Sequence, residues 1–132
     1  MSAKKCDKER VLVVDDDSAT RDLYAAIIND DIPEVKVDLA VNGAEAVKMF
    51  QASRQSVILM DLSMPVMDGI TAFRQIGEYC AKSGDEMPKV VFCTSYAPPE
   101  TLKAVLSAGE SHGFLNKPMT SDKLLKAVRE RL

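Results

Sequence analysis

The chain has 132 residues, 46% of them hydrophobic and 28% charged, which fits one globular domain and is too short for two ordinary ones. With 17 basic against 20 acidic residues, the net charge of −3 gives no sign of a surface that binds nucleic acid. No run reaches the roughly 18 apolar residues of a membrane span. Residues 1–9 are too polar for a signal peptide, so we expect a cytoplasmic protein without membrane contact.

The cysteine and histidine content argues against a zinc site. The three cysteines, Cys6, Cys80 and Cys93, are widely spaced and form no Cys-x-x-Cys pair, and His112 is the only histidine. Cys93 lies within an apolar run, so it is predicted to be a small buried hydrophobic residue.

Strands and helices alternate in the first half of the chain. The continuous apolar run 11–14 predicts a strand buried on both faces, and a helix follows it behind a cap at Ser18. The hydrophobic residues of this helix repeat at helical spacing: Leu23, Ala26 and Ile27. Residues 35–40 alternate between apolar and polar, which predicts an edge strand with one wetter face. The next helix follows Asn42-Gly43 and carries Ala46, Val47 and Phe50.

The same alternation continues to the end of the sequence. Continuous apolar runs at 57–60 and 90–93, and a shorter one at 114–115, predict three further buried strands. Gly84 and Pro88 bracket a loop between the third helix and the fourth strand. The apolar positions of the remaining helices are Ile70, Phe73, Ile76 and Cys80, then Leu102, Val105 and Leu106, then Leu124, Leu125, Val128 and Leu132.

Helix boundaries in the last third of the chain follow from caps and breakers. The fourth helix begins after Pro98-Pro99 and ends at Gly109, and the fifth begins behind a cap at Thr120 or Ser121. The fifth helix also carries a basic cluster: Lys123, Lys126, Arg129 and Arg131. Because the domain as a whole is acidic, we interpret this cluster as a solvated helix face.

Five strand–helix repeats define the fold class. Strict alternation with short connections predicts (βα)₅, an α/β fold with a doubly wound five-stranded parallel sheet and helices on both faces. No internal repeat or interdomain linker is visible. The predicted boundaries are a flexible N-terminal segment at 1–9 and a single domain at 10–132.

Polar residues follow four of the predicted strands at their carboxyl ends. Asp15 and Asp16 come after the first strand, Asp61 after the third, Thr94 after the fourth and Lys117 after the fifth. In an open α/β sheet the ligand crevice lies outside these strand ends, at the topological switch point. Each of these residues alone is commonly a loop, cap or surface residue, but their joint placement predicts one pocket.

The chemistry of this pocket points to a divalent cation and a phosphoryl group. Two unit charges about 4 Å apart repel by about 4 kcal/mol at an effective dielectric near 20, so three clustered carboxylates need protons or a cation. Oxygen ligands with room for water favour Mg²⁺. A carboxylate nucleophile, a metal, a lysine and a hydroxyl are the groups that phosphoryl transfer requires.

These residues match a known family. The sequence resembles the response-regulator receiver domains of two-component signalling, including the single-domain chemotaxis type, from about Arg10 to Leu132. The matching motifs are Val13-Val14-Asp15-Asp16, Asp61-Leu62-Ser63-Met64-Pro65-Val66-Met67-Asp68-Gly69, Thr94, and Phe114-Leu115-Asn116-Lys117-Pro118. The resemblance implies a flavodoxin-like fold with strand order 2-1-3-4-5.

The resemblance also implies roles for individual residues. Asp61 is the expected phosphoacceptor; Asp16, Asp61 and the backbone carbonyl of Ser63 are expected to bind Mg²⁺ directly, and Asp15 through water. Lys117, ahead of a cis peptide to Pro118, is expected to contact the phosphoryl group. The expected switch residues are Thr94, whose hydroxyl moves toward the phosphoryl group, and Phe114, which changes rotamer with it. The spacing from Pro88 to Thr94 is one residue longer than is usual in the family, so counting from Pro88 would select Cys93, but this position needs a hydroxyl.

The expected function is a phosphorylation-dependent signalling switch rather than a turnover enzyme. A histidine kinase or histidine phosphotransfer protein is the expected donor, and the face formed by the fourth helix, fifth strand and fifth helix is expected to bind a downstream protein. Neither Ser63 nor Tyr96, two residues after the acceptor and the switch threonine, offers a carboxylate or amide to orient water. We therefore expect slow autodephosphorylation.

Other α/β families share parts of this pattern. A haloacid-dehalogenase-type phosphatase also uses a strand-end Asp, but Ala19 stands where Thr or Val is expected and no acidic pair follows Lys117. A flavodoxin-type electron carrier would bind FMN phosphate after the first strand, where the acidic loop of this chain repels phosphate. A receiver excised from a larger regulator or hybrid kinase is an alternative context for the same chemistry.

Overall fold

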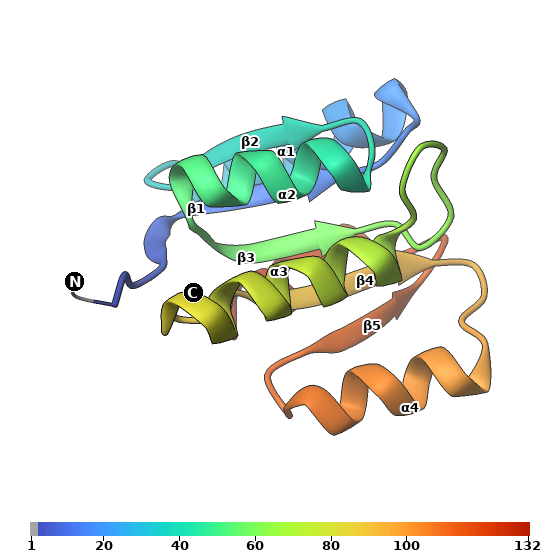
Figure 1. Ribbon diagram of the computed structural model, residues 1–132. Coiled ribbons are helices and arrows are strands. Elements are labelled where there is room, and N and C mark those ends of the chain that lie inside the picture. The colour runs from blue at the N-terminus through green and yellow to red at the C-terminus, as the bar shows by residue number, and fades with distance from the viewer. Residues whose placement is uncertain (1–2) are drawn as a thin grey trace.

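The computed structural model describes residues 3–132 as alternating strands and helices (Figure 1). The elements in chain order are β1 (Asp7–Val14), α1 (Ser18–Asp31), β2 (Lys36–Ala40), α2 (Gly43–Ser53), β3 (Gln55–Met60), α3 (Gly69–Ser83), β4 (Lys89–Thr94), α4 (Pro99–Ala108), β5 (Gly113–Asn116) and α5 (Ser121–Arg129). This order confirms the predicted (βα)₅ arrangement. Among the described residues, no helix combines the length and the apolar character that crossing a membrane requires.

All five strands form one parallel sheet in the order β2-β1-β3-β4-β5, as predicted. β2 is an edge strand, in agreement with its alternating sequence. Helices α1 and α5 contact each other on one face of the sheet. Helices α2 and α3 contact each other on the other face, which is turned toward the viewer in Figure 1. This arrangement places the carboxyl ends of the strands together at one edge of the molecule.

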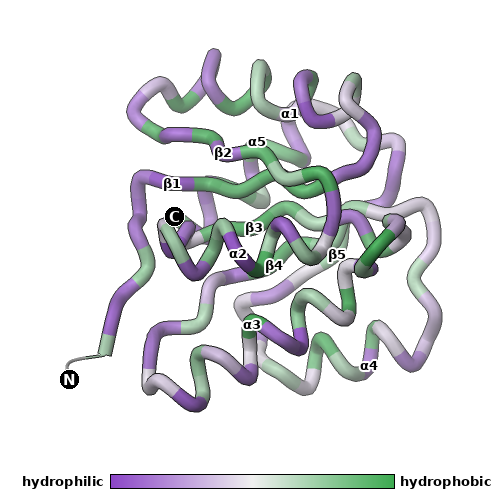
Figure 2. Tube along the Cα trace, turned by 45° about the horizontal axis from the view of Figure 1, so that its top comes forward, coloured by the Kyte–Doolittle hydropathy of each residue, from purple (hydrophilic) through white to green (hydrophobic). Residues whose placement is uncertain are grey.

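The sheet separates two hydrophobic clusters, which explains the continuous apolar runs of the central strands. In β1, Leu12 and Val14 pack toward α2 and α3, whereas Val11 and Val13 pack toward α1 and α5. Successive side chains of a strand point to opposite faces, so a strand covered on both sides has no solvent-facing position. Figure 2 shows this as a hydrophobic band along the central strands, and Cys93 is buried within it as predicted.

The first helix differs from expectation in its cap and its buried face. Asp17, rather than Ser18, is the N-cap, because Asp17 has extended backbone geometry and its carboxylate accepts a hydrogen bond from the Thr20 amide. The buried residues are Tyr24 and Ile28, whereas Leu23 is 56% exposed. The buried stripe is therefore shifted by one position from the hydrophobic residues that the sequence singled out.

Other caps follow the sequence signals. Asn42 and Thr120 cap α2 and α5 with their side chains, and Gly109 ends α4 at a φ of 151°. Asp68 caps α3, whose C-terminal cap is Gly84 in the left-handed region. In the predicted basic cluster, Lys123, Lys126 and Arg129 lie exposed on α5, whereas Arg131 lies beyond the end of this helix and donates hydrogen bonds to the carbonyl oxygens of residues 111 and 127.

The chain is already paired with the body of the fold before the first apolar run. β1 begins at Asp7, whose amide donates to the Arg54 carbonyl at 2.7 Å. Before it, the Lys4 amide donates to the Asp85 carboxylate at 2.7 Å and the Cys6 amide to the Glu86 carboxylate at 2.7 Å. The boundary between a flexible segment at 1–9 and a domain at 10–132 stays a prediction.

A largely buried ion pair ties the end of α2 to the loop before β4. Arg54 caps α2 in the left-handed region, with a φ of 52°. Its Nη1 lies 2.7 Å from the Asp85 carboxylate, and the two side chains are 11% and 5% exposed. Its Nη2 donates to the Tyr79 hydroxyl at 3.0 Å, and its guanidinium lies 5.3 Å from the centre of the Tyr79 ring. Arg54 therefore links three segments of the chain.

His112 is a buried acceptor that should make stability depend on pH. Its Nδ1 accepts the Val90 amide at 3.0 Å, and burial, followed by the charge of Arg131, lowers the pKa of the ring below its ordinary value of 6.5. The unfolded chain then takes up a proton at a pH where the folded chain does not. This contribution is complete above about pH 6.5 and is lost as the pH falls through the folded-state pKa.

We expect His112→Asn to flatten this dependence, because an amide oxygen replaces Nδ1 as acceptor and does not titrate. The measurement is urea unfolding of both proteins at about pH 7.5 and about pH 5.5. The free energy of unfolding should fall more for the wild type than for the variant. Equal losses would contradict the assignment.

Candidate functional site

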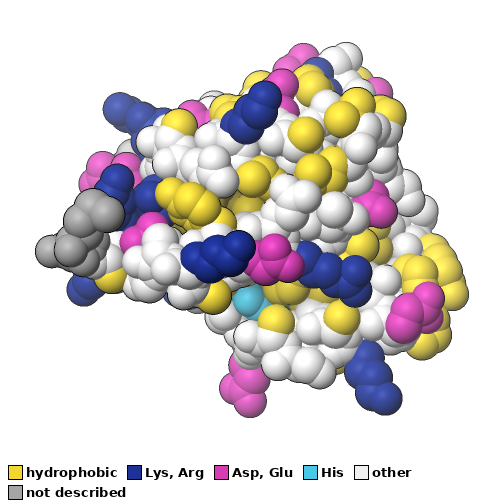
Figure 3. Space-filling view, in the orientation of Figure 1, with side chains coloured by type: hydrophobic (Ala, Val, Ile, Leu, Met, Phe, Trp, Pro, Cys, Tyr) yellow, Lys and Arg dark blue, Asp and Glu magenta, His cyan; other side chains and the backbone are white. Residues whose placement is uncertain are grey.

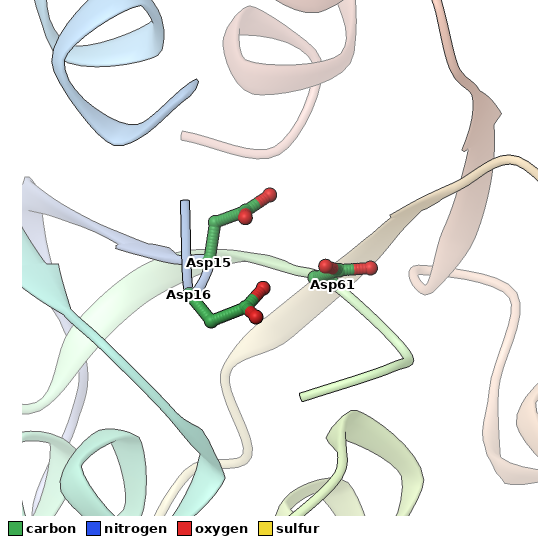
Figure 4. Close-up of side chains that lie close together, drawn as sticks. All are labelled: Asp15, Asp16 and Asp61. Atoms are coloured by element: carbon green, nitrogen blue, oxygen red, sulfur yellow. The ribbon is translucent and has the colours of Figure 1, made fainter. Parts of the chain in front are cut away.

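Three carboxylates meet at the carboxyl edge of the sheet. Asp15 and Asp16 follow β1, Asp61 follows β3, and each offers an oxygen within 4.8 Å of the other two (Figure 4). The Asp15 carboxylate is buried, that of Asp61 is half-buried, and that of Asp16 is exposed. Residues 45 positions apart in sequence are thus neighbours because β1 and β3 are adjacent in the sheet.

The first turn of α1 fixes the position of Asp15. The Asp17 amide donates to Asp15 Oδ1 at 2.9 Å, and the Asp17 carboxylate caps the helix. Arg21, one turn further along, donates from Nη1 to the backbone carbonyl oxygen of Asp15 at 2.7 Å. Arg21 was not predicted from the sequence. It follows the capping residue Asp17 by four positions, and this spacing places its side chain beside the loop between β1 and α1.

Asp61 is held by the backbone on both of its sides. Its amide donates to the Val14 carbonyl at 3.0 Å, which continues the pairing of β3 with β1 past the last strand residue. Beyond it, the Gly69 amide donates to the Leu62 carbonyl at 2.9 Å and closes the loop at the start of α3. A Cβ at Gly69 would overlap the backbone carbonyl oxygen of Asp61 and lie 3.0 Å from Met60 Cγ. Only glycine leaves room for this closure.

Lys117 supplies the positive charge of the site. Its Nζ lies 2.7 Å from Asp15 Oδ2 and 3.6 Å from Asp61 Oδ2. The Lys117 amide donates to the Thr94 carbonyl at 2.9 Å, and the Lys117–Pro118 peptide is cis. Burial lowers the pKa of Lys117, but the hydrogen bond that Lys117 donates to Asp15 and the charges of Asp61 and Asp15 outweigh burial, so that the pKa is raised overall. The lysine is therefore a permanent cation.

The charges of the site do not balance. One lysine faces three carboxylates. The pKa of Asp61 is raised overall, mainly by burial and also by the charges of Asp15 and Asp16. The charge of Lys117 and a backbone hydrogen bond from Ser63 act in the opposite direction. A divalent cation among the three carboxylates would neutralise this excess without a proton on Asp61. The residues present therefore fit Mg²⁺.

Thr94 lies at the end of β4, but its hydroxyl is engaged with its own loop. The hydroxyl donates to the Tyr96 carbonyl oxygen at 3.0 Å and accepts the Tyr96 amide at 3.3 Å. It makes no hydrogen bond with the Asp61 carboxylate. Tyr96 is 69% exposed, and Ser63 is also exposed.

Phe114 lies in β5, away from the carboxylates. Its ring stacks on Phe92 of β4 with centroids 5.5 Å apart and an angle of 26° between planes, and it is only partly buried. Phe92 in turn meets Phe73 of α3 edge to face at 5.6 Å. An aromatic row therefore runs from α3 through β4 to the edge strand β5.

A hollow of about 420 Å³ opens beside Lys117. Its lining includes Thr20, Leu23, Tyr24, Ser95, Pro118 and Met119. Burial raises the pKa of Tyr24 to about 12, so this side chain is a neutral phenol next to the site. Sequence reasoning missed Tyr24, because the apolar spacing in α1 selected Leu23, which instead lies exposed at the rim of this hollow.

Comparisons with known proteins agree with this geometry. The family model described as "Response regulator receiver domain" matches residues 11–129. Chemotaxis protein CheY of Halobacterium salinarum is 32% identical over 124 residues, which cover 94% of this chain and 97% of that protein. A protein-glutamate methylesterase/protein-glutamine glutaminase of Aliivibrio fischeri is 49% identical over 71 residues, but these are 54% of this chain and only 19% of that protein.

Solved structures show the same relationship. A CheY-like response regulator receiver domain protein from Methanospirillum hungatei JF-1 superposes with a TM-score of 0.79 at 25% identity, covering 98% of this chain and 93% of that one. CheY4 of Vibrio cholerae gives 0.74 at 27% identity, covering 99% and 100%. With acidic, lysine and threonine side chains at the expected strand ends, the chain belongs to the response regulator receiver domain family and is a CheY-type, phosphorylation-dependent signalling switch.

Proposed function

We propose that Asp61 accepts a phosphoryl group from the phosphohistidine of a histidine kinase or a histidine phosphotransfer protein in a Mg²⁺-dependent reaction. The observation that supports this most is the position of the Asp61 carboxylate, which lies beside Lys117 and within 4.8 Å of two further carboxylates at the open edge of the sheet. A cytoplasmic location agrees with such a donor.

In this reaction an Asp61 oxygen attacks phosphorus, the bond from phosphorus to the donor imidazole nitrogen breaks, and the leaving imidazole keeps that electron pair and takes up a proton. Lys117 pairs with a phosphoryl oxygen and stays charged throughout. Asp15, Asp16, Asp61 and the Ser63 carbonyl oxygen would hold Mg²⁺, with Asp15 acting through water. The ion would supply charge neutralisation for the attacking carboxylate and the phosphoryl oxygens.

The switch then depends on Thr94 and Phe114. To reach a phosphoryl oxygen, the Thr94 hydroxyl must exchange its two hydrogen bonds with the backbone of residue 96 for one with the new group. The loop before α4 would move with it, and Phe114 would follow at the edge of the aromatic row. The surface of α4, β5 and α5 would thereby change for a downstream protein.

The test is labelling with a small phosphodonor. We expect acetyl phosphate with Mg²⁺ to add one phosphoryl group per chain and no more, which intact mass spectrometry measures. Asp61→Asn should abolish labelling, and Asp22→Asn, an exposed carboxylate in α1, should leave it unchanged. Omission of Mg²⁺ should prevent labelling. Labelling of Asp61→Asn, or continuous release of phosphate without a labelled chain, would contradict the proposal.

The lifetime of the phosphorylated state is a separate expectation. Ser63 and Tyr96 offer no carboxylate or amide to orient an attacking water, so we expect autodephosphorylation to be slow. Ser63→Asn combined with Tyr96→Glu should shorten the half-life by about tenfold, less than the roughly 10²–10⁴-fold typical of a well-positioned general base, because both positions are exposed. Decay of the label after donor removal measures it. An unchanged half-life would contradict the expectation that Ser63 and Tyr96 slow autodephosphorylation.

A further inference from the structure

A groove lies between α3 and α4, away from the carboxylate site. Its volume is about 460 Å³, and its lining is mostly apolar: Phe73, Gly77, Cys80, Ala81, Met87 and Ala108, with Arg74, Gly84, Asp85 and His112. Asp85 and Met87 precede β4, so this groove lies toward the amino ends of the strands, whereas Asp61 lies at their carboxyl ends. In Figure 3, hydrophobic side chains lie beside the cyan histidine on this face, below a row of charged side chains.

His112 presents a free N–H to this groove. Its Nδ1 accepts the Val90 amide at 3.0 Å, so in the neutral ring the proton resides on Nε2. The ring is 5% exposed and is held edge to face against Phe73 at 4.9 Å. Within residues 3–132, nothing accepts a hydrogen bond from Nε2. The Nε2–H borders a space large enough for a ligand to supply an acceptor.

The charges around the groove favour an anion. Arg74 is exposed and makes no ion pair with any residue that the structure describes. The Asp85 carboxylate in the lining is already paired with Arg54 at 2.7 Å, so its charge is offset. The remaining polar groups that face the groove are thus one N–H donor and one guanidinium.

We propose that the groove between α3 and α4 binds a small carboxylate with an apolar or aromatic body, whose oxygens accept the His112 Nε2–H and pair with Arg74. The apolar body would lie along Gly77, Ala81 and Ala108, where small side chains leave the space. Binding at this site requires no phosphoryl group on Asp61.

The test uses 2-naphthoate as the probe, titrated into the full chain and followed by amide chemical shifts. We expect chemical-shift changes confined to the amides of the groove, at Gly77, Ala81, Ala108 and His112. The expected Kd is about 1 mM for a ligand of this size. 2-Naphthylmethanol, which has a similar body without the charge, should bind at least about fivefold more weakly. Absence of shifts at these residues would overturn the proposal.

Variants separate the ligand role of His112 from its structural role. His112→Asn keeps an oxygen acceptor for the Val90 amide and removes the Nε2–H, so it should weaken binding of 2-naphthoate by about five- to tenfold with the amide spectrum otherwise preserved. Arg74→Gln should weaken it several-fold, and Lys82→Gln, an exposed cation of α3 outside the lining, should not. Unchanged affinity in both His112→Asn and Arg74→Gln would mean apolar adsorption only and would refute the site.

Discussion

Replacing Gly69 with alanine should both destabilise the fold and impair phosphorylation. The added Cβ would overlap the Asp61 carbonyl oxygen and lie 3.1 Å from the Asp61 carbonyl carbon, so the backbone must move. Overpacking typically costs about 1–3 kcal/mol, and we expect about 3 kcal/mol here because the neighbouring atoms are backbone. The displaced atoms belong to the proposed acceptor residue, so labelling by acetyl phosphate should also slow.

Gly77→Ala is the matched control. Gly77 lies inside α3, and a Cβ there would meet only Met87 Cε at 3.8 Å, an ordinary contact. Since glycine is unfavourable within a helix, this substitution should stabilise the protein by about 0.5–1 kcal/mol. Urea unfolding measures both proteins. Equal effects of the two substitutions would refute the claim that space at residue 69 is the constraint.

Replacing Arg54 with methionine should lower the free energy of unfolding by about 2–4 kcal/mol. Removing one partner of a buried ion pair leaves the other charge uncompensated, which typically lowers the free energy of unfolding by about 3–5 kcal/mol. We expect somewhat less, because the Lys4 amide still donates to the remaining carboxylate. Methionine keeps the aliphatic contact with Phe50 and Tyr79 but loses the charge and the hydrogen bond to the Tyr79 hydroxyl.

Two comparisons isolate the ion pair. Arg129→Met removes an exposed partner of Asp31, with side chains 52% and 48% exposed, and should cost at most about 1 kcal/mol. The double variant Arg54→Met with Asp85→Asn should be more stable than Arg54→Met alone, since no unpaired charge remains. If Arg54→Met and Arg129→Met had the same effect, burial would not be what makes the Arg54 pair important.

The order and type of the elements were predictable because local pattern and tertiary environment agree. A run such as Val57-Ile58-Leu59-Met60 has no polar position, and the structure covers β3 on both faces. In α1 the local hydrophobic pattern and the tertiary environment disagree. Leu23 has the hydrophobicity of a core residue, but it lies at the rim of a hollow, and Tyr24 takes the buried position. Backbone pairing, such as that of the Asp7 amide with the Arg54 carbonyl, leaves no side-chain signal at all.

The residues of the candidate site were also predictable, but their present contacts were not. Strand ends converge in a parallel sheet, so Asp15, Asp61 and Lys117 had to be neighbours once the topology was given. The hydrogen bonds of the Thr94 hydroxyl with residue 96 depend on the path of the loop after β4, which no residue pattern specifies. The contact of Arg21 with the Asp15 carbonyl depends in the same way on the exact rotation of α1.

The hydrogen bonds that anchor Asp15 couple the position of α1 to the carboxylates of the candidate site. Two hydrogen bonds, one from the Asp17 amide and one from the Arg21 guanidinium, connect the first turn of the helix to opposite ends of the same aspartate. A small displacement of α1 would therefore shift the Asp15 carboxylate directly, without a change in the sheet. A partner bound along α1 would therefore affect the Asp15 carboxylate, and a cation bound to that carboxylate would in return restrict the movement of α1.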